Sequence, residues 1–113
     1  GKAIGREMRE YGVSFCLAPG CALQRTPFDA VSQESWSEDP VLTGLCALFF
    51  CKGVQTHGAA ILRTGTLPRS LDIRLSSLRD IYALPFEIAA SACKAALLST
   101  GKPSVRTATS SGL

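Results

Sequence analysis

The chain has 113 residues, an apolar fraction of 46%, a charged fraction of 19% and a formal net charge of +3. This length allows at most one ordinary domain, and this composition is typical of a globular chain rather than a disordered one. A net charge this small, with arginines scattered among acids, argues against nucleic-acid binding, and no apolar run approaches the roughly 18 residues that span a bilayer.

The N-terminal part predicts a helix, a strand and a long loop. An amphipathic helix is expected over Gly1–Tyr11, ended by Gly12, because a left-handed C-cap favours glycine. Val13–Ala18 predicts a short buried strand, which Pro19-Gly20 ends. Residues 19–39 then form a polar loop, and loops of this length inside compact domains are usually functional.

The middle of the chain predicts a helix from Pro40 to His57 and a strand at Ala59–Leu62. Asp39 is expected to be the N-cap, because its carboxylate can accept hydrogen bonds from the first turn, and proline fits the first helical position. The inner face of this helix is predicted to hold Leu42, Leu45, Cys46, Phe49 and Gly53.

After a connection over 63–75, a third helix is expected over Ser77–Lys94. Ser77 and Asp80 are compatible with a capping box at its start. Pro85 removes one backbone hydrogen bond, so a kink is predicted within this helix.

A third strand is expected at Ala95–Leu98, followed by a tail over 99–113 whose Ser/Thr/Gly composition favours disorder. Strands that alternate with helices at this spacing predict an α/β fold with a parallel sheet. Ligands of such sheets bind beyond the carboxyl ends of the strands, where the loops over 19–39 and 63–75 lie.

The cysteines show no metal-binding pattern, because there is no C-x-x-C pair and only one histidine. We expect no metal or other cofactor and interpret the thiols as buried and free, which favours a reducing compartment such as the cytoplasm. No signal peptide is recognised at the start of the chain. The five cysteines are Cys16, Cys21, Cys46, Cys51 and Cys93.

Several segments together carry a family resemblance. They are Gly5-Arg6-Glu7-Met8-Arg9-Glu10-Tyr11-Gly12-Val13, Leu17-Ala18-Pro19-Gly20, Ser37-Glu38-Asp39-Pro40, Lys52-Gly53-Val54-Gln55, and Leu78-Arg79-Asp80-Ile81-Tyr82 followed by Leu84-Pro85-Phe86-Glu87-Ile88-Ala89. In this order they resemble the N-terminal barrel of glycoside hydrolase family 3, the β-glucosidase type. The resemblance covers residues 1–98 and leaves 99–113 unmatched. It implies a partial (β/α)₈ TIM barrel of about three β/α units with parallel strands.

The departures from the family pattern concern sugar binding. Val31 stands where the family has an arginine that holds sugar hydroxyls, whereas the family's glutamate is kept as Glu34. Leu62-Arg63-Thr64 replaces a Lys-His pair, so Arg63 keeps a single cationic donor there. The family's nucleophile, an aspartate in a Ser-Asp-Trp context, and its general acid are not matched in this chain. The resemblance therefore implies no catalytic residue here.

The acidic loop admits two interpretations. Glu34, Glu38 and Asp39 could form a two-carboxylate glycosidase site, but the structural interpretation is favoured, because Asp39 caps a helix and Glu38 lies at its positive end. Glu34 is predicted to hold the loop or to contact a sugar. Trp36 could stack on a sugar ring or serve as a packing anchor. The candidate substrate-binding residues are Glu34, Arg63 and Trp36.

The sequence thus predicts a fragment of a β-glucosidase-type hydrolase, inactive alone. The parent enzyme would hydrolyse terminal β-linked glucosyl residues with retention, acting on a β-glucoside or an oligosaccharide. The fragment is expected to self-associate or to pair with the missing barrel part. The alternatives are a non-catalytic α/β scaffold or partner-binding module, and the product of a degraded reading frame.

Overall fold

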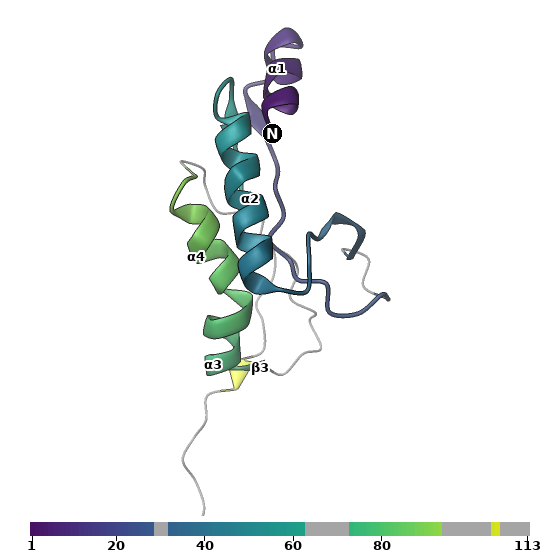
Figure 1. Ribbon diagram of the computed structural model, residues 1–113, viewed down its shortest axis with the longest axis vertical. Helices are drawn as coiled ribbons and strands as arrows, with labels where there is room; N and C mark the ends of the chain where they lie inside the picture. Colours follow the sequence, from purple (N-terminus) through teal and green to yellow (C-terminus); the bar gives the residue numbers. More distant parts are fainter. Residues whose placement is uncertain (29–31, 63–72, 94–104, 107–113) are drawn as a thin grey trace, which may run out of the picture.

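A computed structural model describes residues 1–28, 32–62, 73–93 and 105–106 (Figure 1). Helices and short strands alternate along the chain, as predicted. No described helix has the length and apolar character needed to cross a bilayer. The elements in chain order are α1 (Lys2–Glu10), β1 (Phe15–Cys16), η1 (Ser32–Glu34), α2 (Pro40–Val54), β2 (Ala59–Ala60), β3 (Ile73–Arg74), α3 (Leu75–Ser77), η2 (Leu78–Tyr82), α4 (Leu84–Ala90) and β4 (Val105–Arg106).

The helix α1 ends as its sequence predicts. Gly12 has a φ of 69°, a left-handed conformation that costs little without a Cβ. The backbone N–H of Val13 donates to the carbonyl of Met8 at 2.7 Å, so an otherwise unpaired carbonyl of the last turn is satisfied. Gly5 and Met8 are the buried residues of this helix, on the side that packs against α2.

The strands β1 and β2 form a parallel pair in which Phe15 lies beside Ala59 and Cys16 beside Ala60. Ala60 is fully buried in the core, where Cys16 also packs. Since successive side chains of a strand point to opposite faces, Phe15 lies on the other face, and it is 66% exposed. The prediction that Val13–Ala18 is a buried strand is therefore wrong, because helices cover only one face of this sheet.

The helix α2 begins as predicted but ends earlier, at Val54 instead of His57. The hydroxyl of Thr56 donates to the carbonyl of Gly53 at 2.7 Å, and the backbone N–H groups of His57 and Gly58 both turn back to the carbonyl of Val54. These bonds close the helix before the expected end.

The prediction for the inner face of α2 is wrong for the large apolar side chains. Leu42, Leu45 and Phe49 are exposed, whereas the buried residues are Thr43, Gly44, Ala47, Cys51, Gly53 and Val54. The reason is the close approach of neighbouring helices. A Cβ on Gly44 would lie 2.8 Å from the Cβ of Ile88 in α4, and a Cβ on Gly53 would lie 2.6 Å from the backbone nitrogen of Lys2 in α1. Small residues therefore face the interior.

The third predicted helix, Ser77–Lys94, is divided into α3, the π-helical turn η2 and α4, which ends at Ala90. The backbone N–H of Ala83 donates to the carbonyl of Leu78 at 2.7 Å, and the regular helix resumes only at Leu84. The sequence predicts a kink at Pro85; the structure instead ends the irregular turn before it and places Pro85 in the first turn of α4, where its missing N–H costs no helical hydrogen bond. No side-chain cap bond forms at Ser77, so the predicted capping box is wrong.

The core lies between α2, α4 and the sheet, and a disulfide closes it. Cys51 of α2, which is fully buried, is bonded to Cys93 beyond α4, with the two Cα atoms 5.9 Å apart. The interpretation of all five cysteines as free thiols is wrong for this pair, because the packing of α4 on α2 brings two residues 42 positions apart together. Cys16, Cys21 and Cys46 are free.

The strands β3 and β4 pair in parallel, with Ile73 beside Val105 and Arg74 beside Arg106. The third strand predicted at Ala95–Leu98 lies outside the described residues. Two residues of the tail that the sequence assigns to disorder, Val105–Arg106, form β4; the domain boundary at residue 98 stays a prediction.

Candidate functional site

The loop that follows β1 is organised by one glutamine. The side-chain Nε2 of Gln24 donates to the carbonyls of Ser32 and Ser35 at 3.1 and 2.8 Å, and its backbone N–H donates to the carbonyl of Ser37 at 3.0 Å. The hydroxyl of Ser32 donates to the carbonyl of Thr26 at 2.6 Å. These bonds fold the loop back on itself, so the residues from Ser32 onward have a defined position beside the N-terminus of α2.

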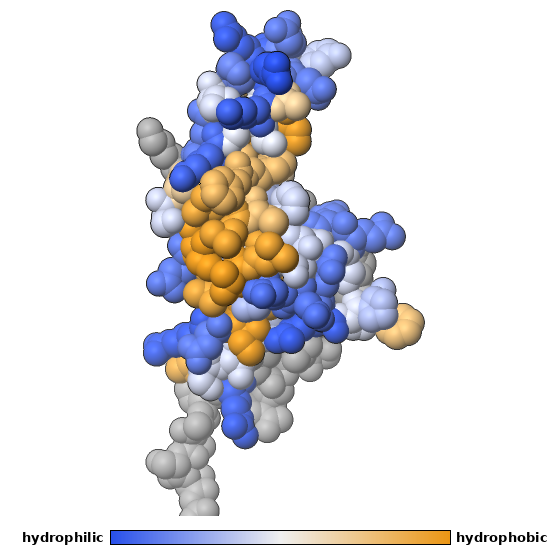
Figure 2. Space-filling model, in the orientation of Figure 1, coloured by the Kyte–Doolittle hydropathy of each residue, from blue (hydrophilic) through white to orange (hydrophobic). Residues whose placement is uncertain are grey.

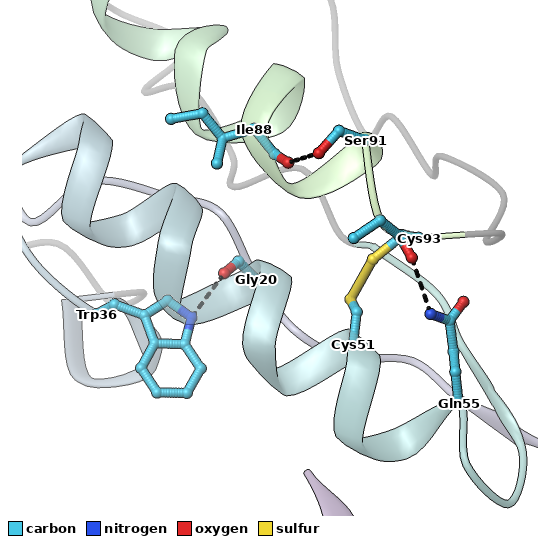
Figure 3. Close-up of a disulfide and its surroundings, with 8 residues drawn as sticks. Gly20, Trp36, Cys51, Gln55, Ile88, Ser91 and Cys93 are labelled. Carbon is cyan, nitrogen blue, oxygen red and sulfur yellow. Dashed lines mark hydrogen bonds between the residues drawn. A yellow bond between two sulfur atoms is a disulfide. The ribbon is translucent and has the colours of Figure 1, made fainter.

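Trp36 joins this loop to the segment after β1 and to the helix α2. Its indole Nε1 donates to the carbonyl of Gly20 at 3.2 Å (Figure 3), and its ring lies 6.1 Å from the ring of Phe50, with the two planes tilted by 58°. Tilted aromatic pairs at this separation are favourable. The structure thus supports the packing-anchor interpretation, yet 42% of the Trp36 surface remains exposed.

The three acids of the loop occupy different positions. Asp39 caps α2, because its Oδ1 accepts from the backbone N–H groups of Val41 and Leu42 at 2.7 and 3.1 Å, which confirms the prediction. Glu34 ends the short helix η1 and is exposed, and Glu38 is exposed just before the cap.

The hydroxyl of Thr43, fully buried in α2, donates to the carbonyl of Ser37 at 3.2 Å. This contact fixes the Ser37–Pro40 segment at the helix start.

The structure brings only part of the predicted binding set together. Glu34 and Trp36 lie two residues apart on the loop that follows β1. Arg63 and Val31 lie outside the described residues, so their relation to this loop stays a prediction. No group of three or more His, Cys, Asp or Glu side chains that could hold a metal ion occurs in the described part of the chain.

Two features of this region have no signal in the sequence. One is the role of Gln24, whose partners lie 8 to 13 residues away. The other is Arg25, whose guanidinium lies over the ring of Tyr82 in η2, 5.3 Å from its centroid. This cation–π contact ties the loop to the third helical segment. Neither contact follows from helix or strand periodicity.

The cysteines near the site are poor nucleophiles. Cys21 is only 2% exposed, and its burial raises the pKa of the thiol from 9.0 to about 12. The reactive species of cysteine is the thiolate, which is scarce at neutral pH for such a thiol. Cys51 and Cys93 are bonded to each other. The side-chain Nε2 of Gln55 donates to the carbonyl of Ala92 at 3.0 Å beside this bond (Figure 3). A disulfide and a hydrogen bond therefore both connect the C-terminal end of α2 to the residues that follow α4.

Comparison with known proteins decides the family. The model of the glycosyl hydrolase family 3 N-terminal domain matches residues 1–66, more than half of the chain. The chain belongs to this family. Within glycosyl hydrolase family 3, the chain is 31% identical over 109 residues to a probable beta-glucosidase I of Neosartorya fischeri, a match that covers 88% of this chain and 13% of that protein. It is 34% identical over 96 residues to a beta-glucosidase of Rhizobium radiobacter, covering 77% of this chain and 12% of the relative.

Solved structures of the family have the same fold. Beta-glucosidase 3B of Thermotoga neapolitana in complex with glucose is 38% identical, with a TM-score of 0.72, over 82% of this chain and 14% of the enzyme. The same enzyme in complex with glycerol gives 39% and 0.71 over the same shares. The chain thus spans about one eighth of the length of the curated relatives. The predicted family and the partial α/β barrel are confirmed.

Proposed function

We propose that this chain is a piece of the catalytic barrel of a β-glucosidase and has no glycosidase activity alone. The observation that carries the proposal is the agreement of sequence and fold with glucose-bound beta-glucosidase 3B over 82% of the chain. The parent enzyme would hydrolyse terminal β-linked glucosyl residues of β-glucosides or oligosaccharides with retention, which requires two carboxylates that flank the scissile bond.

The positions of two acids at the start of α2 support the absence of activity. Asp39 uses its Oδ1 to cap α2, and Glu38 lies at the positive end of the helix dipole. Both positions have a structural explanation. Neither the nucleophile nor the general acid of the family is matched here, so one acid on a loop cannot complete a two-carboxylate mechanism.

The test of the absence of activity is hydrolysis of an aryl β-glucoside by the pure 113-residue chain. We expect no turnover above the buffer rate. Turnover that disappears in Glu34→Gln but persists in Glu38→Gln, the matched loop control, would refute the proposal.

We propose that Glu34 and Trp36 contact a glucosyl unit, together with Arg63. Trp36 keeps exposed ring surface after its anchoring contacts, and aromatic faces of this kind stack on apolar faces of sugars. A carboxylate such as that of Glu34 accepts hydrogen bonds from sugar hydroxyls.

Trp36 is the only tryptophan of the chain, so its fluorescence reports on this loop alone. We expect glucose to change the emission in a saturable way, with a weaker response in Glu34→Gln than in Glu38→Gln. An equal response in the two variants would remove Glu34 from the binding set.

A second role, as a module that pairs with the rest of a barrel, is favoured by the uncovered face of the β1–β2 sheet. Val13, Phe15 and Leu17 alternate along the chain on this face, and all three are exposed. In a closed barrel such side chains fill the interior. Mixing the chain with a barrel domain of the family that lacks the corresponding segment should give a stable complex, and Phe15→Asp should abolish it. A complex that tolerates Phe15→Asp would count against this role.

A further inference from the structure

The face of α2 directed away from the core carries a continuous apolar surface. We call Val41, Leu42, Leu45 and Phe49 the outer stripe; their exposed fractions run from 41% to 65%. The stripe lies in the orange area at the centre of Figure 2. Together these side chains expose apolar surface on the order of 400 Å², a size at which patches on monomers are often functional.

The composition of α2 indicates that this face has an occupant. Between Pro40 and Val54, only Thr43 and Lys52 have polar side chains, and a helix that is apolar on every side is normally buried on every side. The small residues of α2 already pack against α1 and α4. The outer stripe is therefore the side that these partners leave uncovered.

The order of residues along the stripe is self-complementary. Leu42, Leu45 and Phe49 follow one another at steps of three and four residues, the spacing of a helix–helix seam, and Lys52 follows three residues later; Glu38 precedes the helix, just before its cap residue Asp39. Leu45 is the midpoint, with Glu38 seven residues before it and Lys52 seven residues after it. An acid thus stands at one end of the apolar stripe and a base at the other, and both are exposed.

We propose that the outer stripe is a surface by which two copies of this chain associate, with their α2 helices antiparallel about a two-fold axis at Leu45. In this arrangement Leu45 meets Leu45 of the second copy, and Leu42 meets Phe49. Glu38 meets Lys52 at both ends, so the two ion pairs are equivalent, as in any isologous interface. A parallel arrangement would bring like charges together at each end. The antiparallel one is favoured by charge complementarity.

The contacts of Lys52 fit this arrangement. Its Nζ lies 5.7 Å from the centroid of the Phe49 ring, so the ammonium already stands at the border of the apolar stripe. The small apolar area of the outer stripe limits the affinity of the dimer. A standard interface buries about 800 Å² on each partner, roughly twice the apolar surface of the stripe. The dimer should therefore dissociate reversibly on dilution.

The first experiment is sedimentation velocity of the 113-residue chain over a range of concentrations. We expect a reversible monomer–dimer equilibrium, and Leu45→Glu should raise the dissociation constant at least 30-fold, because it sets two carboxylates against each other on the axis. The matched control is Phe15→Glu on the uncovered sheet face, which should change the constant by less than about twofold. Both positions are exposed, and circular dichroism verifies that each variant keeps its helices.

The second experiment is a charge exchange. Glu38→Lys and Lys52→Glu alone should each weaken association about 3- to 10-fold at low salt, and the double variant should return to within about twofold of the parent. Glu38 precedes the first turn of α2 and Lys52 lies in its last turn, with roughly 18 Å of helix between Pro40 and Lys52, so their mutual rescue requires contact between copies. A chain that stays monomeric at millimolar concentration, a dimer broken by Phe15→Glu but not by Leu45→Glu, or single effects that add without rescue would each overturn the proposal.

Discussion

Reduction of the Cys51–Cys93 disulfide should lower the free energy of unfolding by about 4 kcal/mol. The bond joins residues 42 positions apart, and closing a loop of that length restricts the unfolded chain by an entropy worth roughly 4 kcal/mol at 25 °C. Domains of this size are stable by about 5–15 kcal/mol in total, so the bond supplies a large share of the stability.

The assay is urea unfolding followed by circular dichroism, with and without a dithiol reductant. For an m-value on the order of 1.5 kcal/mol/M, the midpoint should fall by roughly 2–3 M on reduction. The double variant Cys51→Ala/Cys93→Ala should unfold at or below the reduced midpoint, because Cys51 is fully buried and its loss also opens a cavity. The matched control, Cys16→Ala/Cys46→Ala, removes two half-buried free thiols and should keep the response to reductant.

Alkylation in denaturant verifies the bond itself. Three cysteines should react before reduction, since Cys16, Cys21 and Cys46 are free, and all five should react afterwards. Oxidised and reduced midpoints that agree within about 0.5 M, or five reactive thiols before reduction, would refute the reasoning.

Three further predictions concern packing, capping and pH. Gly44→Ala should destabilise the fold by about 1–3 kcal/mol, because its Cβ would lie 2.8 Å from the Cβ of Ile88, whereas Gly20→Ala, with open space around it, should be neutral in the same urea titration. Asp39→Ala should cost about 1 kcal/mol through loss of the α2 cap, and Asp39→Asn should recover most of it; equal losses would exclude capping as the cause. Burial raises the pKa of the Cys21 thiol from 9.0 to about 12 in the folded chain, so the folded chain keeps a proton that the unfolded chain loses. The free energy of unfolding should therefore fall as pH rises from 9 to 12, by up to about 4 kcal/mol relative to Cys21→Ala. Parallel pH profiles for the two proteins would contradict this.

Local chemistry made some elements predictable from sequence. The left-handed position at Gly12 and the cap at Asp39 each depend on the properties of one residue and its near neighbours. The parallel pairing of β1 with β2 follows from the alternation of strands and helices. These features need no knowledge of what packs against them.

The failures concern contacts between distant segments. Periodicity assigned the inner face of α2 mainly to large apolar side chains, but close helix packing selected Gly44 and Ala47 and left Phe49 outside; Gly53 is buried as predicted. The partners Cys51 and Cys93 have no spacing signal, because α4 brings them together only once it packs on α2. At the site, Asp39 and the packing of Trp36 were predictable, whereas the bonds that Gln24 makes across the loop were not.

The bond between Cys51 and Cys93 also makes residues 51–93 a covalent ring. A protease that cuts after Arg74 or Arg79, two exposed residues inside this ring, severs the backbone without separating the pieces. The nicked molecule would stay in one piece until the disulfide is reduced, and the helices on either side of the cut would remain tethered. For a segment this small, integrity of the molecule is therefore decided by its sulfur chemistry as much as by its peptide bonds.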